Sequence, residues 1–224
     1  MSTQIWQPLL LSLQLAFVST LILLVIALPL CILVEKVTPR LRPVIEATIS
    51  LPIVLPPSVL GFYLLLAMAP EGLIGRFSNA LGLGSLNFTF SGLVIGSVCY
   101  SLPFVVQPVL ASLRAIPVEA YQTASSLGIP PRLQLYFVTI PLCSRGFFTG
   151  GILGFAHTLG EFGVVLMIGG SIPGETKVVS IAIYDYVETL AYKQAHSLSL
   201  ILLLIAFSIL LLSKVLEKRW SKQS

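Results

Sequence analysis

Long apolar segments constrain this 224-residue chain more than any other feature. Five stretches each hold about 20 predominantly apolar residues, the length that an α-helix needs to cross the hydrocarbon core of a bilayer. They run from about Leu9 to Val34, Val44 to Ala69, Phe90 to Ala111, Phe147 to Gly169 and Ser197 to Ser213. Only 10% of the residues are charged, against about 25% in soluble domains. The sequence therefore predicts an all-α integral membrane protein with a single transmembrane domain over residues 1–224.

Prolines interrupt the second apolar segment. Leu51-Pro52 and Pro56-Pro57 fall inside it, and a proline within a helix kinks or breaks it. A six-span protein, with this segment counted twice, would put the flanking loops on mismatched sides, so we expect about five crossings. Between the last two spans, Val178 to Gln194 carries apolar residues at helical spacing beside charged ones, which predicts a short surface helix.

The distribution of lysine and arginine sets the orientation. With five spans, the connecting segments alternate between the two sides of the membrane. One side receives Lys36, Arg40, Arg42, Arg114, Arg132, Arg145, Lys214, Lys218, Arg219 and Lys222. The other side receives only Arg76, Lys177 and Lys193. Because cytoplasmic loops are enriched in Lys and Arg, we expect the amino terminus outside and the carboxyl terminus in the cytoplasm.

Charge placement and cysteine spacing exclude other classes of protein. The net charge of +4 does not indicate nucleic-acid binding, because the basic residues are scattered at the ends of apolar runs. Cys31, Cys99 and Cys143 lie more than 40 residues apart, so we expect neither a metal site nor a cofactor. The first charged residue is Glu35, unlike the basic start of a signal peptide, and we expect the first apolar run to remain as a membrane helix.

The longest cytoplasmic segment, about Ser112 to Gly146, has the pattern of a helix, a stop and a second helix. Pro117 suits a first helical turn, and Glu119 follows near the positive end of the helix dipole. Gly128 can end this helix in a left-handed conformation. The second part starts at Pro130-Pro131 and has an apolar face of Leu133, Tyr136, Phe137 and Ile140. The first helix can either fit a groove on another protein or pack on its own bundle; its small residues are Ala120, Thr123 and Ala124.

This segment resembles the signature of the permease subunits of ABC importers, which reads Glu-Ala-Ala, three residues, Gly, nine residues, Ile, one residue, Leu-Pro. The matching positions here are Gln122-Thr123-Ala124, Gly128, Val138 and Ile140-Pro141. Gln122 and Thr123 depart from the pattern but are close in size to Glu and Ala, so we expect the helix to persist. In that family the loop docks into a groove of the ATP-hydrolysing subunit. The resemblance implies this coupling role for Glu119, Ala120, Gln122, Thr123, Ala124, Gly128, Val138 and Pro141.

Two further regions resemble molybdate-type permeases. One is Leu51 to Tyr63, and the other is Gly154 to Gly163, followed by Ser171 to Thr176. The resemblance extends from about Leu10 to Leu212 and implies a type I importer permease fold with its core at about residues 10–213. Sulfate and thiosulfate permeases share the Gly-Glu-Phe-Gly element, so sulfate, thiosulfate and tungstate remain alternatives to molybdate. His157 stands where family members often have Arg, which would weaken a positive field along the pathway.

Glu161 is the only acidic residue well inside an apolar span. Carboxylates within a membrane are costly and by default suggest function. One interpretation is a gate or hinge formed by His157, Gly160, Glu161, Phe162 and Gly163. The other is a structural carboxylate paired with His157, four residues earlier on the same helix face. A negative charge is a poor ligand for an oxyanion, so we do not assign Glu161 to substrate binding.

The energy for active transport must come from a partner, because the chain lacks G-x-x-x-x-G-K-[ST], the phosphate-binding loop of many ATPases. The resemblance implies two copies of a cytoplasmic ATP-binding subunit, an extracytoplasmic substrate-binding protein and a second copy of this chain. We expect a pore-forming, non-enzymatic subunit in the cytoplasmic membrane that moves molybdate. A passive channel or a membrane enzyme is the alternative class. A channel needs no coupling loop. An enzyme would gather several polar catalytic groups at one depth of the membrane, and only Glu161 and His157 are candidates for such groups.

Overall fold

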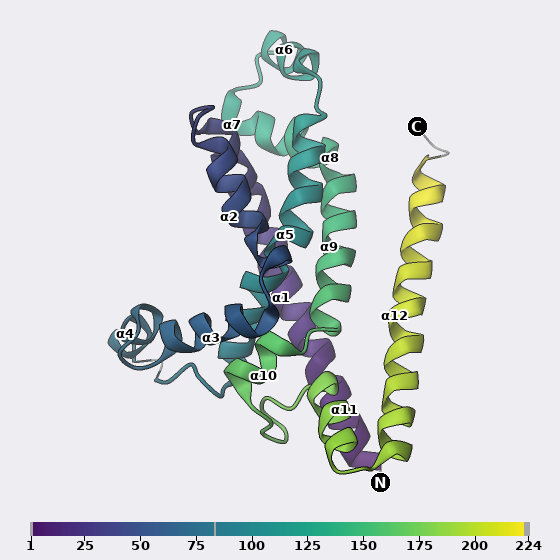
Figure 1. The fold of residues 1–224 in the computed structure, drawn as a ribbon. Coiled ribbons are helices and arrows are strands. Elements are labelled where there is room, and N and C mark those ends of the chain that lie inside the picture. The colour runs from purple at the N-terminus through teal and green to yellow at the C-terminus, as the bar shows by residue number, and fades with distance from the viewer. Residues whose placement is uncertain (1, 83, 222–224) are drawn as a thin grey trace.

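The computed structural model describes residues 2–82 and 84–221, with side chains described for residues 6–82 and 84–216. Within these residues the fold is helical and contains no strand (Figure 1). The helices are α1 (Ser2–Lys36), α2 (Arg42–Val54), α3 (Pro57–Met68), α4 (Leu73–Ala80), α5 (Phe90–Arg114), α6 (Val118–Ser126), α7 (Pro131–Gln134), the π-helix η1 (Leu135–Thr139), α8 (Ile140–Leu142), α9 (Ser144–Leu159), α10 (Gly163–Gly169), α11 (Val179–Glu188) and α12 (Tyr192–Ser221).

Four helical segments are long and apolar enough to cross a membrane, and the count reaches five when one bent pair is taken as a single span. The four are Trp6–Lys36, Pro57–Ala80, Phe90–Arg114 and Tyr192–Leu216. The bent pair joins Pro131–Leu142 to Ser144–Leu159 at an angle of 63°. The prediction of an all-α membrane protein with about five spans is thus confirmed.

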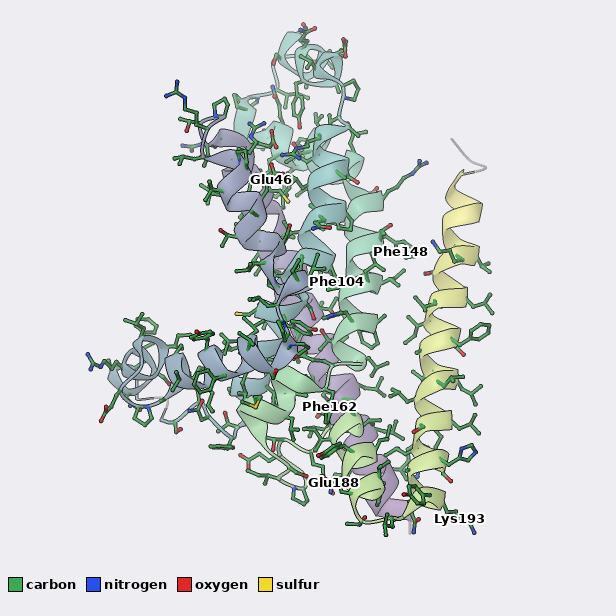
Figure 2. All side chains as sticks on the ribbon, viewed as in Figure 1. Glu46, Phe104, Phe148, Phe162, Glu188 and Lys193 are labelled. Atoms are coloured by element: carbon green, nitrogen blue, oxygen red, sulfur yellow. The ribbon has the colours of Figure 1, made fainter. Side chains whose placement is uncertain are left out.

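Basic residues gather at the end of the bundle that carries α6 (Figure 1). Lys36 ends α1, Arg42 begins α2, Arg114 ends α5 and Arg132 lies in α7. By the positive-inside rule, this α6 end is the cytoplasmic end. Figure 2 places Glu46 toward the α6 end, and Glu188 and Lys193 at the opposite, external end. Of the basic residues assigned to the cytoplasm, Lys222 lies outside the described residues, as do the side chains of Lys218 and Arg219.

The proline-rich second segment is broken, as predicted. α2 ends at Val54, Leu55 and Pro56 are extended with ψ of 135° and 133°, and α3 begins at Pro57. The residue before a proline is pushed away from the helical conformation, which accounts for a break at this place. Figure 1 shows α3 and α4 running across the direction of α1, α5 and α9.

The predicted fourth span, Phe147 to Gly169, is wrong as one continuous helix. α9 ends at Leu159 and α10 begins at Gly163, and Phe162 between them has the non-helical backbone angles φ −130° and ψ −59°. The hydroxyl of Ser180 donates to the carbonyl of Glu161 at 2.6 Å and so satisfies an acceptor that the break releases. A contact from α11, whose Ser180 lies 19 residues further along the chain, therefore stabilises the non-helical conformation between α9 and α10.

The surface helix is shorter than predicted, and the last span is longer. α11 covers Val179–Glu188, and Leu190 turns the chain with a positive φ of 58°. α12 begins directly after this turn, at Tyr192, five residues before the predicted start at Ser197. It lies at the edge of the bundle (Figure 1), with only 11% of its most apolar window buried.

α5 is the central helix of the bundle and packs along α1 and α9. Its residues Val105, Val106 and Val109 are buried against Leu23 and Ala27 of α1. α9, which also packs on α1, approaches α5 closely through three glycines spaced four residues apart: Gly146, Gly150 and Gly154. In membranes, where water does not drive helices together, small residues at this spacing let the helix backbones approach and pack.

Candidate functional site

α6 is a nine-residue helix that projects from the cytoplasmic end of the bundle (Figure 1). Pro117 caps its amino end, and Gly128 follows its last turn with φ +77°. Backbone hydrogen bonds close the turn, from Ile129 N–H to the Ala124 carbonyl at 3.0 Å and from Gly128 N–H to the Ser125 carbonyl at 2.9 Å. The predicted helix and its glycine stop are confirmed. The conformation of Gly128 is one that costs a side-chain-bearing residue free energy, which explains the glycine.

The residues matched to the importer signature divide into an outer and an inner set. Those of the outer set are exposed: Glu119, Gln122, Thr123, Gly128 and Pro141. Ala120 is half-buried, whereas Ala124 is 5% exposed and Val138 is 9% exposed. Of the two alternatives for the small residues of this helix, Ala124 follows the second, because it packs inside the chain, whereas Thr123 is exposed and free to face a partner. The predicted apolar face of the second part is exposed throughout: Leu133, Tyr136, Phe137 and Ile140.

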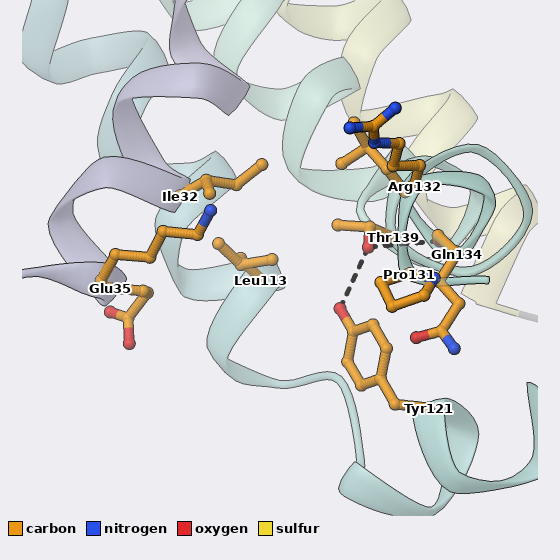
Figure 3. A pocket seen from close by; sticks show the side chains of 10 residues that line it. Ile32, Glu35, Leu113, Tyr121, Pro131, Arg132, Gln134 and Thr139 are labelled. Carbon is orange, nitrogen blue, oxygen red and sulfur yellow. Dashed lines mark hydrogen bonds between the residues drawn. The ribbon is translucent and has the colours of Figure 1, made fainter. Parts of the chain in front are cut away.

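The segment that follows α6 is a helical elbow, which we define as α7, η1 and α8 (residues 131–142). Polar side chains attach α6 to this elbow (Figure 3). The hydroxyls of Tyr121 and Thr139 lie 3.1 Å apart, and the Gln134 amide donates to the Ser125 hydroxyl at 3.0 Å and to the Ile129 carbonyl at 2.9 Å. None of these contacts was predicted from the sequence. The available sequence signal is the position of the polar Gln134 between Leu133 and Leu135, and in the structure Gln134 is only 9% exposed.

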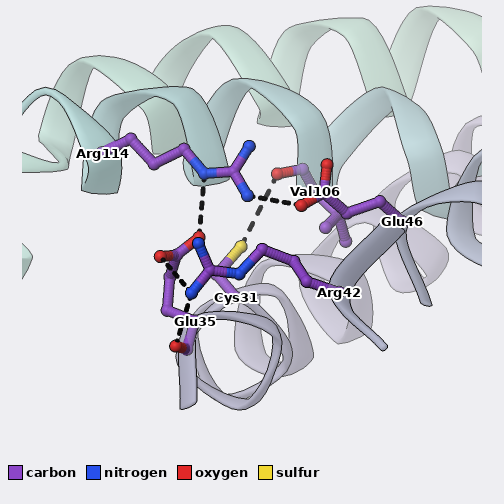
Figure 4. A network of polar contacts seen from close by, with 6 residues as sticks. All are labelled: Cys31, Glu35, Arg42, Glu46, Val106 and Arg114. Atoms are coloured by element: carbon purple, nitrogen blue, oxygen red, sulfur yellow. Dashed lines mark hydrogen bonds and ion pairs between the residues drawn. The ribbon is translucent and has the colours of Figure 1, made fainter. Parts of the chain in front are cut away.

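An ion-pair network joins three helices at the cytoplasmic end (Figure 4). Arg114 of α5 donates to Glu35 of α1 at 2.8 Å and to Glu46 of α2 at 2.5 Å. Arg42 donates to the Glu35 carbonyl at 2.8 Å and contacts its carboxylate at 3.3 Å. Beneath the network, the Cys31 thiol faces the Val106 carbonyl at 3.6 Å. The network fixes the cytoplasmic ends of α1, α2 and α5 relative to one another.

A second polar cluster lies within the bundle, where α5 faces α9. The Ser101 hydroxyl lies 2.9 Å from Nδ1 of His157 and 2.8 Å from the Thr158 hydroxyl. The His157 ring stacks on Phe104, with ring centroids 3.9 Å apart, and is tilted against Tyr100 at 4.7 Å. This cluster holds the last turn of α9 to α5.

Glu161 lies in the break between α9 and α10 and is 4% exposed. The interpretation that it pairs with His157 is wrong, because α9 ends at Leu159 and the two residues do not share a helix face. The hydroxyl of Ser97 is the polar group beside its carboxyl. Neither carboxyl oxygen of Glu161 makes a close hydrogen bond to another described residue. A buried polar group without a partner is costly, so its presence at a break in a membrane helix suggests a functional role.

The remaining predicted pathway residues surround this break. Phe162 is half-buried and its ring lies 5.2 Å from that of Tyr184 on α11. Gly163 begins α10 against α3, and a β-carbon on it would lie 2.7 Å from Cβ of Pro57. Gly160 has space around it. The structure thus brings Glu161, Phe162 and Gly163 to the junction of α3, α10 and α11, and leaves His157 on the α5 side. The described residues include no group of three His, Cys, Asp or Glu side chains that could hold a metal ion.

Solved structures of ABC importers share this fold. A bacterial ABC transporter involved in the import of alginate matches with a TM-score of 0.77 at 17% identity, over 98% of this chain and 80% of that chain. An amino acid ABC transporter matches with a TM-score of 0.66 at 16% identity, over 97% of this chain and 94% of that chain. The fold is therefore that of the transmembrane subunits of ABC importers, as predicted.

The sequence gives the family. The model for binding-protein-dependent transport system inner membrane components matches residues 27–222, and the chain belongs to this family. It is 50% identical to the molybdenum transport system permease protein ModB of Azotobacter vinelandii, over 89% of this chain and 88% of that protein. The ModB proteins of Haemophilus influenzae and Escherichia coli K12 are 35% and 31% identical, over 88% and 95% of this chain and 88% and 93% of theirs.

Family membership defines the role of the chain in its transport system. It is a multi-pass component of the inner membrane, and it is the permease subunit rather than a catalytic one. A binding-protein-dependent system also contains a substrate-binding protein and an ATPase, which are the partners of this subunit.

Proposed function

We propose that this chain is the permease subunit of an ATP-driven molybdate importer and provides the path of the anion across the cytoplasmic membrane. The observation that carries the proposal is the 50% identity, over 89% of the chain, to a protein named as a molybdenum transport permease. The whole chain acts as one transmembrane domain, with residues 112–146 as its cytoplasmic coupling loop.

In the proposed assembly, two copies of the chain line the path, and each copy binds one cytoplasmic ATPase subunit. α6 docks on the ATPase through its outer residues, of which Glu119, Gln122 and Thr123 are exposed at the cytoplasmic end. Ala124 and Val138 support this surface from within the chain. The division into outer and inner residues explains how one short motif can combine docking with internal packing.

The break around Glu161 is the proposed gate region. A segment that leaves a helix at Leu159 and enters another at Gly163 can change its backbone angles without unfolding a long helix. Hinge residues of this kind absorb the φ and ψ changes of a conformational transition. Gly160, Phe162 and Gly163 form the hinge, and Glu161 and His157 lie on either side of the end of α9.

Selection of the anion is assigned to the external binding protein. The lysine and arginine side chains described lie at the ends of the spans or in the connecting segments, so the apolar middle of the bundle offers a dianion no cation. A dry dianion needs several donors or cations to be stable. The pathway is therefore permissive, and affinity comes from the partner that delivers the anion.

Uptake of labelled molybdate tests the proposal. Cells that lack the gene for this chain should lose uptake at low molybdate concentration and regain it when the chain is supplied. An excess of unlabelled molybdate should abolish uptake, whereas the same excess of sulfate should leave most of it. Uptake that does not depend on the chain would contradict the proposed cargo.

Sulfate is the second candidate cargo. The chain is 31% identical, over 75% of its length, to a probable sulfate transport system permease of Zygnema circumcarinatum, although the match spans only 58% of that protein. Competition in the same assay separates the candidates, since a sulfate permease would lose molybdate uptake to a modest excess of sulfate. Tungstate and thiosulfate are tested as further competitors.

A further inference from the structure

The attachment of α6 to the rest of the chain is one-sided. Among the helices, α6 packs mainly against α7 and η1, which belong to the elbow. The elbow continues into α9 through a bend of 63° at Cys143. On its other side, α6 connects to α5 through a short stretch of chain, Ala115 to Pro117. A displacement of α6 can thus be transmitted through two connections. The route toward α9 runs through the elbow, and the route toward α5 runs through Ala115 to Pro117.

Two side-chain hydrogen bonds join α6 to the elbow, and Figure 3 shows the one between Tyr121 and Thr139. One joins the hydroxyls of Tyr121 on α6 and Thr139 on η1 at 3.1 Å, and Thr139 is 5% exposed. The other runs from the buried Gln134 amide to Ser125 on α6 at 3.0 Å. Both bonds are partly buried, and the loss of either one removes a partner from the buried Thr139 hydroxyl or from the buried Gln134 amide. We call these four residues the α6 clamp.

The route toward α5 is loose by comparison. A pocket of about 610 Å³ separates the clamp from the cytoplasmic ends of α1 and α5, and its walls include Ile32, Leu113 and Leu135 as well as Tyr121 and Thr139. Figure 3 shows Ile32 and Leu113 on one side of this space, with Tyr121, Thr139 and Gln134 across from them. A movement of α6 and the elbow toward or away from Ile32 and Leu113 therefore meets open space at this place.

A π-helix lies within the route toward α9. Residues 135–139 form η1, and the Thr139 hydroxyl also lies 3.5 Å from the carbonyl of Gln134, the residue before this helix. Single π-helical turns often occur at functional sites. The same threonine thus holds the widened turn and receives the contact from α6.

We propose that the α6 clamp makes α6 and the elbow one rigid unit, so that the movement imposed on α6 by the ATPase is delivered to α9 and the break at Glu161. Tyr121, Ser125, Gln134 and Thr139 are positioning residues in this scheme: they transmit a displacement and contact neither the anion nor ATP. The inference rests on the proposed coupling function of α6.

The experiment measures molybdate transported per ATP hydrolysed by the complete importer in liposomes. The variants are Tyr121→Phe and Thr139→Val, each of which removes one hydroxyl, and their combination with Gln134→Leu. Tyr136→Phe is the matched control, because the Tyr136 side chain is 64% exposed on the same elbow and has no hydrogen bond to a described residue. Thr139→Ser keeps the hydroxyl and serves as the conservative variant.

We expect the clamp variants to retain the ATPase on purification and to hydrolyse ATP, while transport per ATP falls about fivefold or more, the range of a modest coupling free energy. Tyr136→Phe and Thr139→Ser should keep the wild-type ratio. An unchanged ratio in Tyr121→Phe and Thr139→Val would overturn the inference, as would an equal fall in Tyr136→Phe. Loss of the ATPase from the purified variants would also overturn it, since the clamp would then shape the docking surface.

The experiment distinguishes failure of the proposed molybdate import from failure of the α6 clamp, because each would appear in a different sample. If the proposed function is wrong, the unaltered importer shows no ATP-dependent uptake of molybdate. If only the clamp is wrong, the unaltered importer works and the variants match it. The single-hydroxyl variants keep the test decisive even where the Gln134→Leu combination fails to fold, because each removes one hydroxyl and nearly keeps the shape of the side chain.

Discussion

The packing of α9 on α5 predicts that the same substitution destabilises the chain at one of two adjacent glycines and not at the other. A β-carbon at Gly150 would lie 2.8 Å from the carbonyl oxygen and 3.2 Å from the Cα of Val105, both atoms of the backbone of α5. A β-carbon at Gly151 meets only the end of the Leu24 side chain, at 3.5 Å. The substitution Gly150→Ala must push two central helices apart by several tenths of an ångström, whereas Gly151→Ala fits in place.

The magnitudes follow from packing and helix propensity. Overpacking of a close contact costs about 1–3 kcal/mol, and replacing glycine by alanine within a helix returns about 0.5–1 kcal/mol. We expect Gly150→Ala to lose about 1–2 kcal/mol of unfolding free energy and Gly151→Ala to lose none. The measurement is unfolding of the full chain in mixed micelles as a denaturing detergent is added. Equal midpoints for the two variants, or a higher midpoint for Gly150→Ala, would refute the packing argument.

Three further substitutions test the sites. Gly128→Val forces a β-branched residue into the left-handed conformation at a cost of about 1–2 kcal/mol, so it should weaken co-purification of the ATPase while Gly128→Asn preserves it; full retention by the valine variant would count against coupling by α6. Glu161→Gln should unfold no earlier than the wild type, because the buried carboxyl lacks a cationic partner among the described residues; an earlier midpoint would mean that the charge is stabilised. Arg114→Ala should lose about 1 kcal/mol at low salt and less at high salt, since its pairs with Glu35 and Glu46 are partly exposed; a salt-independent loss would rule out an ionic origin.

Much of the fold could be predicted because the signals are local. The length of an apolar run fixes whether it can span a bilayer, and the positions of Lys and Arg fix its direction. Pro56-Pro57 favours a break in the second segment through the restriction it places on the neighbouring backbone, although Pro52, Pro103 and Pro108 lie inside helices. Gly128 stops α6 for the same kind of reason. These features depend on the chain within a few residues of each position.

The errors occurred where a distant segment decides the outcome. The fourth span was predicted as continuous, yet the chain breaks between Leu159 and Gly163, where Ser180 of α11 satisfies the Glu161 carbonyl. One of the two interpretations of Glu161 paired it with His157, but the Ser101 hydroxyl of α5 lies 2.9 Å from Nδ1 of His157 instead. In both cases the hydrogen-bond partner, Ser180 or Ser101, lies too far away in the sequence for a local pattern to reveal it.

The order of residues is enough to show a helical membrane protein with a cytoplasmic helix–stop–helix segment, because bilayer thickness, charge placement and proline or glycine conformation act along the chain. The inward-facing side of that helix depends instead on how the segments pack in three dimensions. This packing buries Ala124, exposes Gln122, and joins Tyr121 to Thr139 across 18 positions. Helix periodicity gives the faces of α6, but the bend of the elbow selects the face that packs and leaves the other free for a partner.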